Sequence, residues 1–217
     1  MSLAKIPFVL SVVWGMDRSM TPPRPPPSSS ERLEVSGNFV EQYIIPSVGL
    51  LKKAFWLPGL IETATILASN FPDAPLAPWV LRHLAPPSGW ALNLVGTLLR
   101  IHCYRKLDRL FTFELAVQKE QKLVTDGVYG IVRHPSYTAV LTACIGCYAA
   151  QLCPGSWLYE YAGFAPTAAL GTFLMALLTV GIGERILTED DMLRKGFGEQ
   201  WEEWAKRVPY RLIPGIL

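Results

Sequence analysis

Two long stretches without charged residues decide how this chain folds. Residues 134–159 read HPSYTAVLTACIGCYAAQLCPGSWLY, and after Glu160 residues 161–183 read YAGFAPTAALGTFLMALLTVGIG. Neither stretch contains Asp, Glu, Lys or Arg. A membrane-spanning helix needs about 20 mostly apolar residues, and both stretches are long enough. They therefore predict two spanning helices joined by a turn near Pro154.

Two more segments fit the same pattern. The chain carries no Asp, Glu, Lys or Arg between Arg82 and Arg100, and residues 54–71 carry only Glu62. We therefore predict an all-α integral membrane protein with about four spanning helices, or five if the part before residue 84 holds two. The alternative is a soluble protein with a large core hairpin, but buried soluble helices seldom run this long without a charge.

The composition excludes several classes of protein. Of the 217 residues, 50% are hydrophobic and only 18% are charged, whereas soluble domains average about 25% charged residues. The net charge of +2 gives no reason to expect nucleic acid as a partner. Cys144 and Cys147 form a CxxC inside an uncharged stretch, with no second pair and no histidine cluster. We expect them to pack between helices, and we expect neither a disulfide nor a bound metal.

The N-terminal part looks different from the rest. Residues 21–30 read TPPRPPPSSS, a composition typical of extended or disordered chain. We predict that residues 1–36 form a poorly structured and dispensable tail, and that residues 37–217 form one membrane-embedded domain. Pro46 and Pro58 are expected to kink or break helices between residues 39 and 71.

The basic residues predict an orientation. Most Lys and Arg lie in residues 100–133 and after Glu184, and the turn near Pro154 has none. Two spanning helices separate the two basic segments, so both segments lie on one side of the membrane. The excess of positive charge predicts that this side is the cytosol.

Polar residues cluster at that side in two places. Residues 123–137, LVTDGVYGIVRHPSY, lead into one span, and residues 184–191, ERILTEDD, leave the next. Arg185 and Glu189 are four apart and share a helix face. From the pattern alone, they are an ordinary surface ion pair and His134 is a polar residue at the interface. In the same reading, the aromatic residues nearby are interfacial belt residues: Tyr129, Tyr137, Trp201 and Trp204.

The first cluster, followed by a hairpin and by ERILTEDDMLRKGFGEQWEEWAKRVP at residues 184–209, resembles the isoprenylcysteine carboxyl methyltransferase family. The resemblance covers residues 95–217 and rests on two motifs in the same order. Members are membrane enzymes that use S-adenosylmethionine to methylate the C-terminal prenylcysteine carboxylate of processed CaaX proteins. Related membrane methyltransferases and reductases carry strings similar to RHPSY.

The resemblance implies roles for individual residues. Arg185 and Glu189 would be catalytic, Arg185 holding the substrate carboxylate and Glu189 contacting the cofactor. The cofactor would also be bound by residues of the first motif and its upstream flank: Gln118, Gln121, Lys122, Leu123, Val124, Tyr129, His134, Pro135, Ser136 and Tyr137. A closing segment would fold over the site: Phe197-Gly198, Trp201, Trp204 and Arg207-Val208-Pro209.

The same resemblance implies where the protein acts. The methyltransferase domain would lie in the endoplasmic reticulum membrane, in contact with lipid. A cytosolic cofactor site would be formed by the last helices and the C-terminal segment. The partner would be the prenylated C-terminal cysteine of CaaX proteins.

The expected chemistry needs positioning more than acid–base catalysis. The nucleophile is a carboxylate with an ordinary pKa of about 3.5, so it is already ionised at neutral pH. Arg185 can present a planar fork to it, while Glu189 offsets the positive charge of the cofactor.

Two alternative functions stay open. A membrane methyltransferase acting on another lipid or lipophilic small molecule would have no use for an anion clamp if the headgroup were cationic. A non-catalytic membrane scaffold would not bind S-adenosylmethionine.

Overall fold

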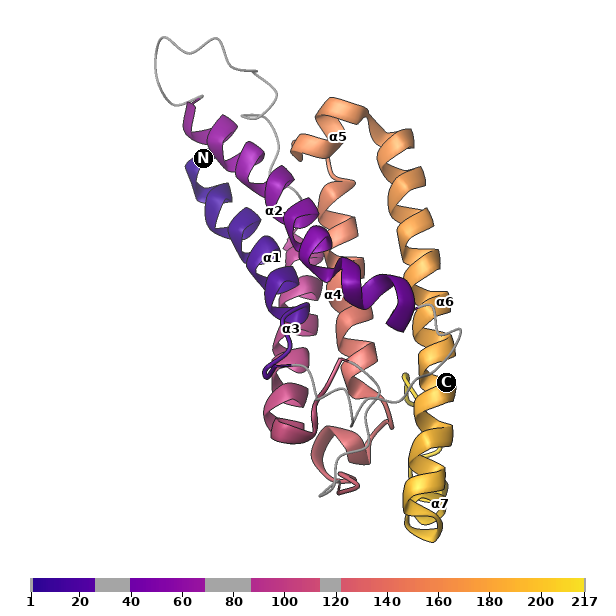
Figure 1. Cartoon of the computed structure of the whole chain (residues 1–217). Helices are drawn as coiled ribbons and strands as arrows, with labels where there is room; N and C mark the ends of the chain where they lie inside the picture. Colours follow the sequence, from indigo (N-terminus) through magenta and orange to yellow (C-terminus); the bar gives the residue numbers. More distant parts are fainter. Residues whose placement is uncertain (1, 26–39, 69–86, 114–121, 217) are drawn as a thin grey trace.

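The computed structural model describes residues 2–25, 40–68, 87–113 and 122–216 (Figure 1). Over these residues the fold is all-α, as predicted. A π-helical turn, Val40–Ile44, leads directly into the second helix. The seven α-helices of the described residues are α1 (Ile6–Ser19), α2 (Ile45–Ala68), α3 (Pro87–Leu107), α4 (Pro135–Gln151), α5 (Trp157–Ala162), α6 (Phe164–Phe197) and α7 (Glu199–Arg207).

Helices α3 and α4 pack closely through small residues. A Cβ atom added to Gly96 would lie 2.4 Å from the backbone nitrogen of Ala143, and one added to Gly146 would lie 2.2 Å from that of Asn93. The Asn93 side chain also donates a hydrogen bond of 2.9 Å to the Ala143 carbonyl. Small residues allow such close approach between membrane helices, where interhelical hydrogen bonds add stability. The start of α4, with its His-Pro-Ser-Tyr motif, is thereby held against α3.

Helix α1 corrects the prediction of a poorly structured tail over residues 1–36. Ile6–Ser19 is a helix, and Val12 and Met16 belong to the central core. Residues 26–36 lie outside the described residues. The apolar stretch at residues 6–16 is too short to span a bilayer. Packing stabilises even a short helix, however, and here α1 packs against α2, α3 and α4. The rest of that core comes from α3 and α4: Trp90, Ala143, Cys144, Cys147 and Ala150.

Helix α2 runs unbroken from Ile45 to Ala68, so neither Pro46 nor Pro58 breaks it. Pro46 lies in the first turn, where its missing N–H is not needed. Pro58 lies inside the helix. Lys52 does not interrupt the helix either, because its ammonium group lies 3.2 Å from Asp17 of α1. Contact with α1 therefore neutralises a charge that interrupts the apolar sequence of this helix.

Two of the described helices are long and apolar enough to cross a bilayer, Gln42–Ala68 and Phe164–Phe197. Only 6% and 17% of their apolar windows are buried in the protein, whereas the core helices of a soluble protein are mostly buried. At 1.5 Å per residue, the 34 residues of α6 extend about 51 Å, roughly 20 Å more than the hydrocarbon core. A spanning α6 therefore carries Arg185 and Glu189 beyond the hydrocarbon.

The two polar clusters lie at the same end of the molecule, as predicted. Figure 1 shows the start of α4, the ends of α3 and α6, and α7 at one end, while α5 lies at the other. Backbone hydrogen bonds join the first cluster to the C-terminal segment, from the Arg133 N–H to the Tyr210 carbonyl and from the His134 N–H to the Arg211 carbonyl. Cys144 and Cys147 lie in the core between helices, where the sequence placed them.

Candidate active site

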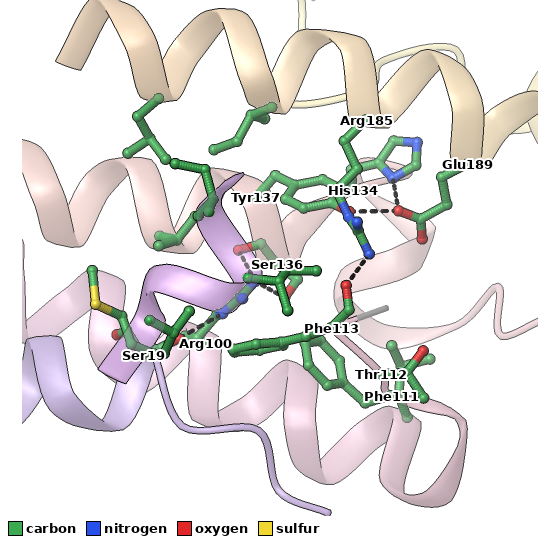
Figure 2. Close-up of a pocket in the computed structure, with 18 of the residues that line it drawn as sticks. Ser19, Arg100, Phe111, Thr112, Phe113, His134, Ser136, Tyr137, Arg185 and Glu189 are labelled. Carbon is green, nitrogen blue, oxygen red and sulfur yellow. Dashed lines mark hydrogen bonds and ion pairs between the residues drawn. The ribbon is translucent and has the colours of Figure 1, made fainter. Parts of the chain in front are cut away.

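A cavity of about 190 Å³ opens at the end that holds the two clusters (Figure 2). Its walls come from the end of α1, the start of α2, α3 with residues 110–113, the start of α4, and α6. Polar side chains lie toward α4 and the end of α6. One side of the cavity is apolar and consists of residues from α2, α4, α6 and the turn before α2: Ile44, Ile45, Val48, Leu51, Val140, Leu178 and Ile182.

Tyr137 connects the two catalytic residues predicted from the sequence. Its hydroxyl donates to Glu189 Oε2 at 2.7 Å and accepts from Arg185 Nε at 2.8 Å. Arg185 Nη2 also donates to the Phe113 carbonyl. Arg185 is 5% exposed and Glu189 is half-buried, so this is not simply a pair of solvated surface charges. The structure thus brings the motif before α4 into direct contact with the polar part of α6.

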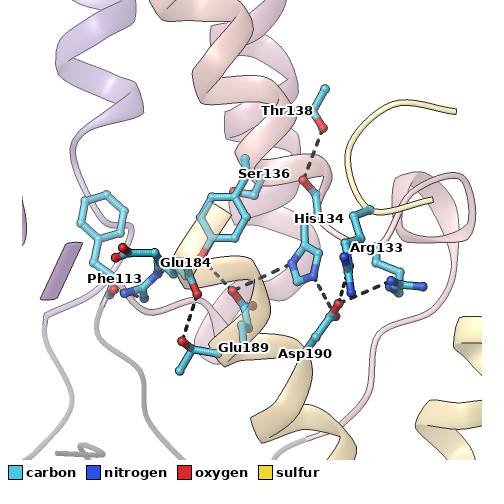
Figure 3. Close-up of polar contacts among 12 residues, drawn as sticks. Phe113, Arg133, His134, Ser136, Thr138, Glu184, Glu189 and Asp190 are labelled. Atoms are coloured by element: carbon cyan, nitrogen blue, oxygen red, sulfur yellow. Dashed lines mark hydrogen bonds and ion pairs between the residues drawn. The ribbon is translucent and has the colours of Figure 1, made fainter. Parts of the chain in front are cut away.

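His134 lies between two carboxylates (Figure 3). Its Nε2 is 2.9 Å from Asp190 Oδ1, and its Nδ1 is 3.9 Å from Glu189 Oε2. The residue immediately precedes α4, and Pro135 occupies the first turn, where a missing N–H costs nothing. The ring is buried and lines the cavity.

Asp190 is the centre of a cationic cluster. Besides His134 it contacts Arg211 Nε at 3.0 Å and Arg133 Nη2 at 3.4 Å. Burial raises the pKa of Asp190, but the His134 hydrogen bond and the neighbouring positive charges outweigh it, so the pKa is lowered overall. An ionised carboxylate only accepts hydrogen bonds, so His134 must carry a proton on Nε2. Asp190 therefore orients the imidazole ring.

The C-terminal segment folds back over this cluster. Gly198, with a φ of +53°, separates α6 from α7 and allows the turn that an L side chain would strain. Trp201 and Trp204 pack on Tyr129 in a buried cluster, and the Trp204 indole donates to the Tyr129 carbonyl at 3.0 Å. These aromatic residues are therefore core residues of the closing segment, not members of an interfacial belt.

The residues predicted to bind the cofactor divide into three groups. Tyr129, His134, Ser136 and Tyr137 line the cavity, as Arg185 and Glu189 do. A second group does not line it: Lys122 is exposed, Leu123 and Val124 pack on the Tyr129 cluster, and Pro135 is buried. Gln118 and Gln121 lie outside the described residues.

Sequence reasoning missed several residues of the site. Arg133 and Asp190 are direct neighbours of His134 and Glu189, so their place in the motifs was the available signal. Arg100 looked like the flanking charge of a spanning helix, yet it lines the cavity. Ser19 and Met20 line it as well, and only the packing of α1 brings them there.

Known proteins match the segment that carries the cavity. Residues 90–195 match the model of the isoprenylcysteine carboxyl methyltransferase (ICMT) family. Protein-S-isoprenylcysteine O-methyltransferase B of Arabidopsis thaliana is 30% identical over 164 residues, covering 74% of each chain. The chain belongs to the isoprenylcysteine carboxyl methyltransferase family. It is therefore a membrane methyltransferase that uses S-adenosylmethionine.

Other relatives cover less of the chain. The protein-S-isoprenylcysteine O-methyltransferase of Schizosaccharomyces pombe is 34% identical over 118 residues, 53% of this chain and 44% of that protein. The 7-dehydrocholesterol reductase of Danio rerio is 29% identical over 98 residues, 45% of this chain and 18% of the reductase. The likeness to reductases agrees with the expectation that they carry similar strings. No solved structure matches this chain significantly.

Proposed function

We propose that this protein methylates the C-terminal carboxylate of a prenylcysteine, the reaction named for its Arabidopsis and fission yeast relatives. The observation that carries the proposal is the two-sided cavity. Arg185, Tyr137 and Glu189 occupy its polar end, and residues of α2, α4 and α6 form an apolar side. A prenylcysteine has the same two parts, a carboxylate and a long hydrocarbon chain.

Arg185 is suited to hold the acceptor carboxylate. Tyr137 and the Phe113 carbonyl contact two of its nitrogens and fix the plane of its guanidinium group. A planar guanidinium pairs with a carboxylate through two parallel hydrogen bonds. Since the acceptor is already ionised, the site needs to position its oxygen and exclude water, not to remove a proton.

The remaining polar residues fit the methyl donor. S-adenosylmethionine has a cationic sulfonium and an ammonium group, and Glu189 presents a half-buried carboxylate to the cavity. When bound, the cofactor supplies an electrophilic methyl group. Glu189, His134 and Tyr137 would hold its cationic part, and Asp190 keeps His134 in one orientation. Because Tyr137 bonds both Arg185 and Glu189, it sets the spacing between acceptor and donor sites.

The apolar side suggests how the substrate enters. Val48 and Leu51 come from α2, and Leu178 and Ile182 come from α6, two described helices that are long and apolar enough to cross a bilayer. A prenyl chain reaching the cavity between them stays in an apolar environment, which avoids a cost of about 0.8 kcal/mol per CH₂ exposed to water. We propose that α3 and α4 also span, giving four spans in the endoplasmic reticulum membrane. The polar end then faces the cytosol.

Incubating the purified protein with labelled S-adenosylmethionine and N-acetyl-S-farnesylcysteine tests this function. The expected product is a base-labile methyl ester, with no transfer to the corresponding farnesylcysteine amide. Calorimetry with S-adenosylhomocysteine serves as the control for an intact cofactor site. Cofactor binding without transfer to the carboxylate would overturn the proposal and point to another lipophilic acceptor.

A further inference from the structure

The proposed function leaves one buried arginine of the cavity without a role. Arg100 of α3 is 7% exposed and lines the same cavity as Arg185 (Figure 2). In the part of the chain that the structure describes, its hydrogen-bond partners are all neutral. They are the Ser19 carbonyl at 3.4 Å, the Tyr104 hydroxyl at 3.0 Å, and the Ser136 carbonyl at 2.9 Å and hydroxyl at 2.5 Å.

Two other buried cations, Lys5 and Arg133, each lie next to a carboxylate. Lys5 lies 2.7 Å from Glu62, and Arg133 lies 3.4 Å from Asp190. A buried charge without a counter-charge is costly, so arginines in such places are usually paired or functional. Arg100 instead lies over three aromatic rings, which offset part of that cost. The distances to the ring centroids are 5.1 Å for Tyr104, 5.3 Å for Phe111 and 5.6 Å for Phe113.

One edge of the Arg100 guanidinium remains available to a ligand. Its hydrogen bonds use Nε and Nη1, and Nη2 makes none within the described residues. Nη2 keeps some exposed surface, and Arg100 is one of the residues that line the cavity. The bonds and rings hold the group rigidly, and a pre-organised donor loses little entropy when a ligand binds.

We propose that Arg100 binds the amino-acid carboxylate of the methyl donor. Two carboxylates meet in a carboxyl methyl transfer, that of the acceptor and that of S-adenosylmethionine. Three arginines line this cavity, and one of them, Arg133, already pairs with Asp190. The other two, Arg100 and Arg185, lie on different helices. Both contact Phe113, Arg185 through its carbonyl and Arg100 over its ring. If Arg185 takes the acceptor, as the proposed function requires, Arg100 is the cation left for the donor. Glu189 then lies in the same cavity for the donor's positive groups.

Binding of S-adenosylhomocysteine and of its decarboxylated analogue, measured by calorimetry without acceptor, tests this role. Wild type should bind the decarboxylated analogue at least roughly tenfold more weakly, the size expected for a charge-assisted hydrogen bond. Arg100→Gln should raise the Kd of S-adenosylhomocysteine by a similar factor and leave that of the analogue within about twofold. Arg105→Gln, which removes an exposed charge from the same helix, should change neither.

Three results would overturn the proposal. Equal affinity of wild type for both ligands would do so without any variant, which covers the case in which Arg100→Gln does not fold. If Arg100→Gln raised the Kd of both ligands equally, Arg100 would have only a structural role, joining α1, α3 and α4. An unchanged Kd with a raised KM for farnesylcysteine would assign Arg100 to the acceptor. Failure of the methyl transfer itself would leave the binding comparison intact, so the two proposals fail separately.

Discussion

The two ends of this molecule both bury charged residues, but they do so differently. At the end near α5, Lys5 and Glu62 satisfy each other, and Glu62 also accepts from the Trp157 N–H at 3.0 Å while Lys5 donates to the Gly155 carbonyl. The cavity there is about 20 Å³, room for roughly one water molecule. That end holds the N-terminal helix in place.

At the other end, polar side chains are held in place, but some of their hydrogen-bonding atoms have no partner in the described part of the chain. Glu189 accepts through Oε2, while its Oε1 has no partner in the described part of the chain, and Arg100 leaves Nη2 open. The cavity is far larger, at about 190 Å³. In this protein, a structural ion pair and a ligand site are both buried. They differ in whether all of their polar atoms have hydrogen-bond partners.

The largest effect should come from breaking the buried ion pair of Lys5 and Glu62. Lys5→Met leaves Glu62 as an uncompensated buried charge and should reduce stability by about 3–5 kcal/mol. Thermal unfolding in detergent measures the loss. The double variant Lys5→Met/Glu62→Leu should recover most of it, because two apolar residues replace a buried pair at little cost. A double variant no better than the single one would mean that the pair itself is needed for the fold.

Arg185→Lys should leave stability nearly unchanged and remove function. The lysine keeps the charge but loses the two-pronged geometry, so kcat/KM for farnesylcysteine should fall about 100-fold, or ~2.7 kcal/mol. The charge swap Arg185→Glu/Glu189→Arg should restore nothing if the two residues have different roles. Near-normal activity of the swap would show that they are only an ion pair.

Asp190→Asn should have an intermediate effect that depends on pH. The lowered pKa of Asp190 contributes stability that is present above its ordinary value of 3.8 and lost as the pH falls below it. At pH 7 the variant should be less stable by about 2 kcal/mol, the worth of hydrogen bonds to a charged group. The difference from wild type should shrink below about pH 4, which thermal unfolding across pH would show. A difference that stays constant with pH would exclude an ionised Asp190.

Glu189→Gln should give the smallest effect. The side chain keeps its size and its hydrogen bond from Tyr137, but it no longer offsets a cation. The Kd of S-adenosylhomocysteine, which retains the ammonium group, should rise about tenfold, or ~1.4 kcal/mol, while Asp191→Asn on the exposed face serves as the control. An equal loss in Arg185→Lys would show that the division of roles between Arg185 and Glu189 is wrong.

The structure overturned two expectations from the sequence. Residues 1–36 were predicted to be a poorly structured tail, yet α1 contributes Met16 to the core and Ser19 to the cavity wall. Pro46 and Pro58 were expected to kink or break this part of the chain, yet α2 runs unbroken from Ile45 to Ala68, and its Lys52 pairs with Asp17 of α1. The first error has a tertiary cause, because the helices on which α1 packs lie elsewhere in the chain.

The sequence by itself determined the class of protein and the residues that meet at the site. Long uncharged stretches specify membrane helices because hydrophobicity is a property of each helix alone, and the two motifs flank a hairpin that must bring them together. Only the tertiary structure decided which charged side chains are paired with a counter-charge and which line a cavity. Arg100 follows an uncharged stretch and Lys5 precedes an apolar one, so each is a basic residue at the edge of an apolar segment. Their roles differ because burial and hydrogen-bond partners come from helices distant in the chain.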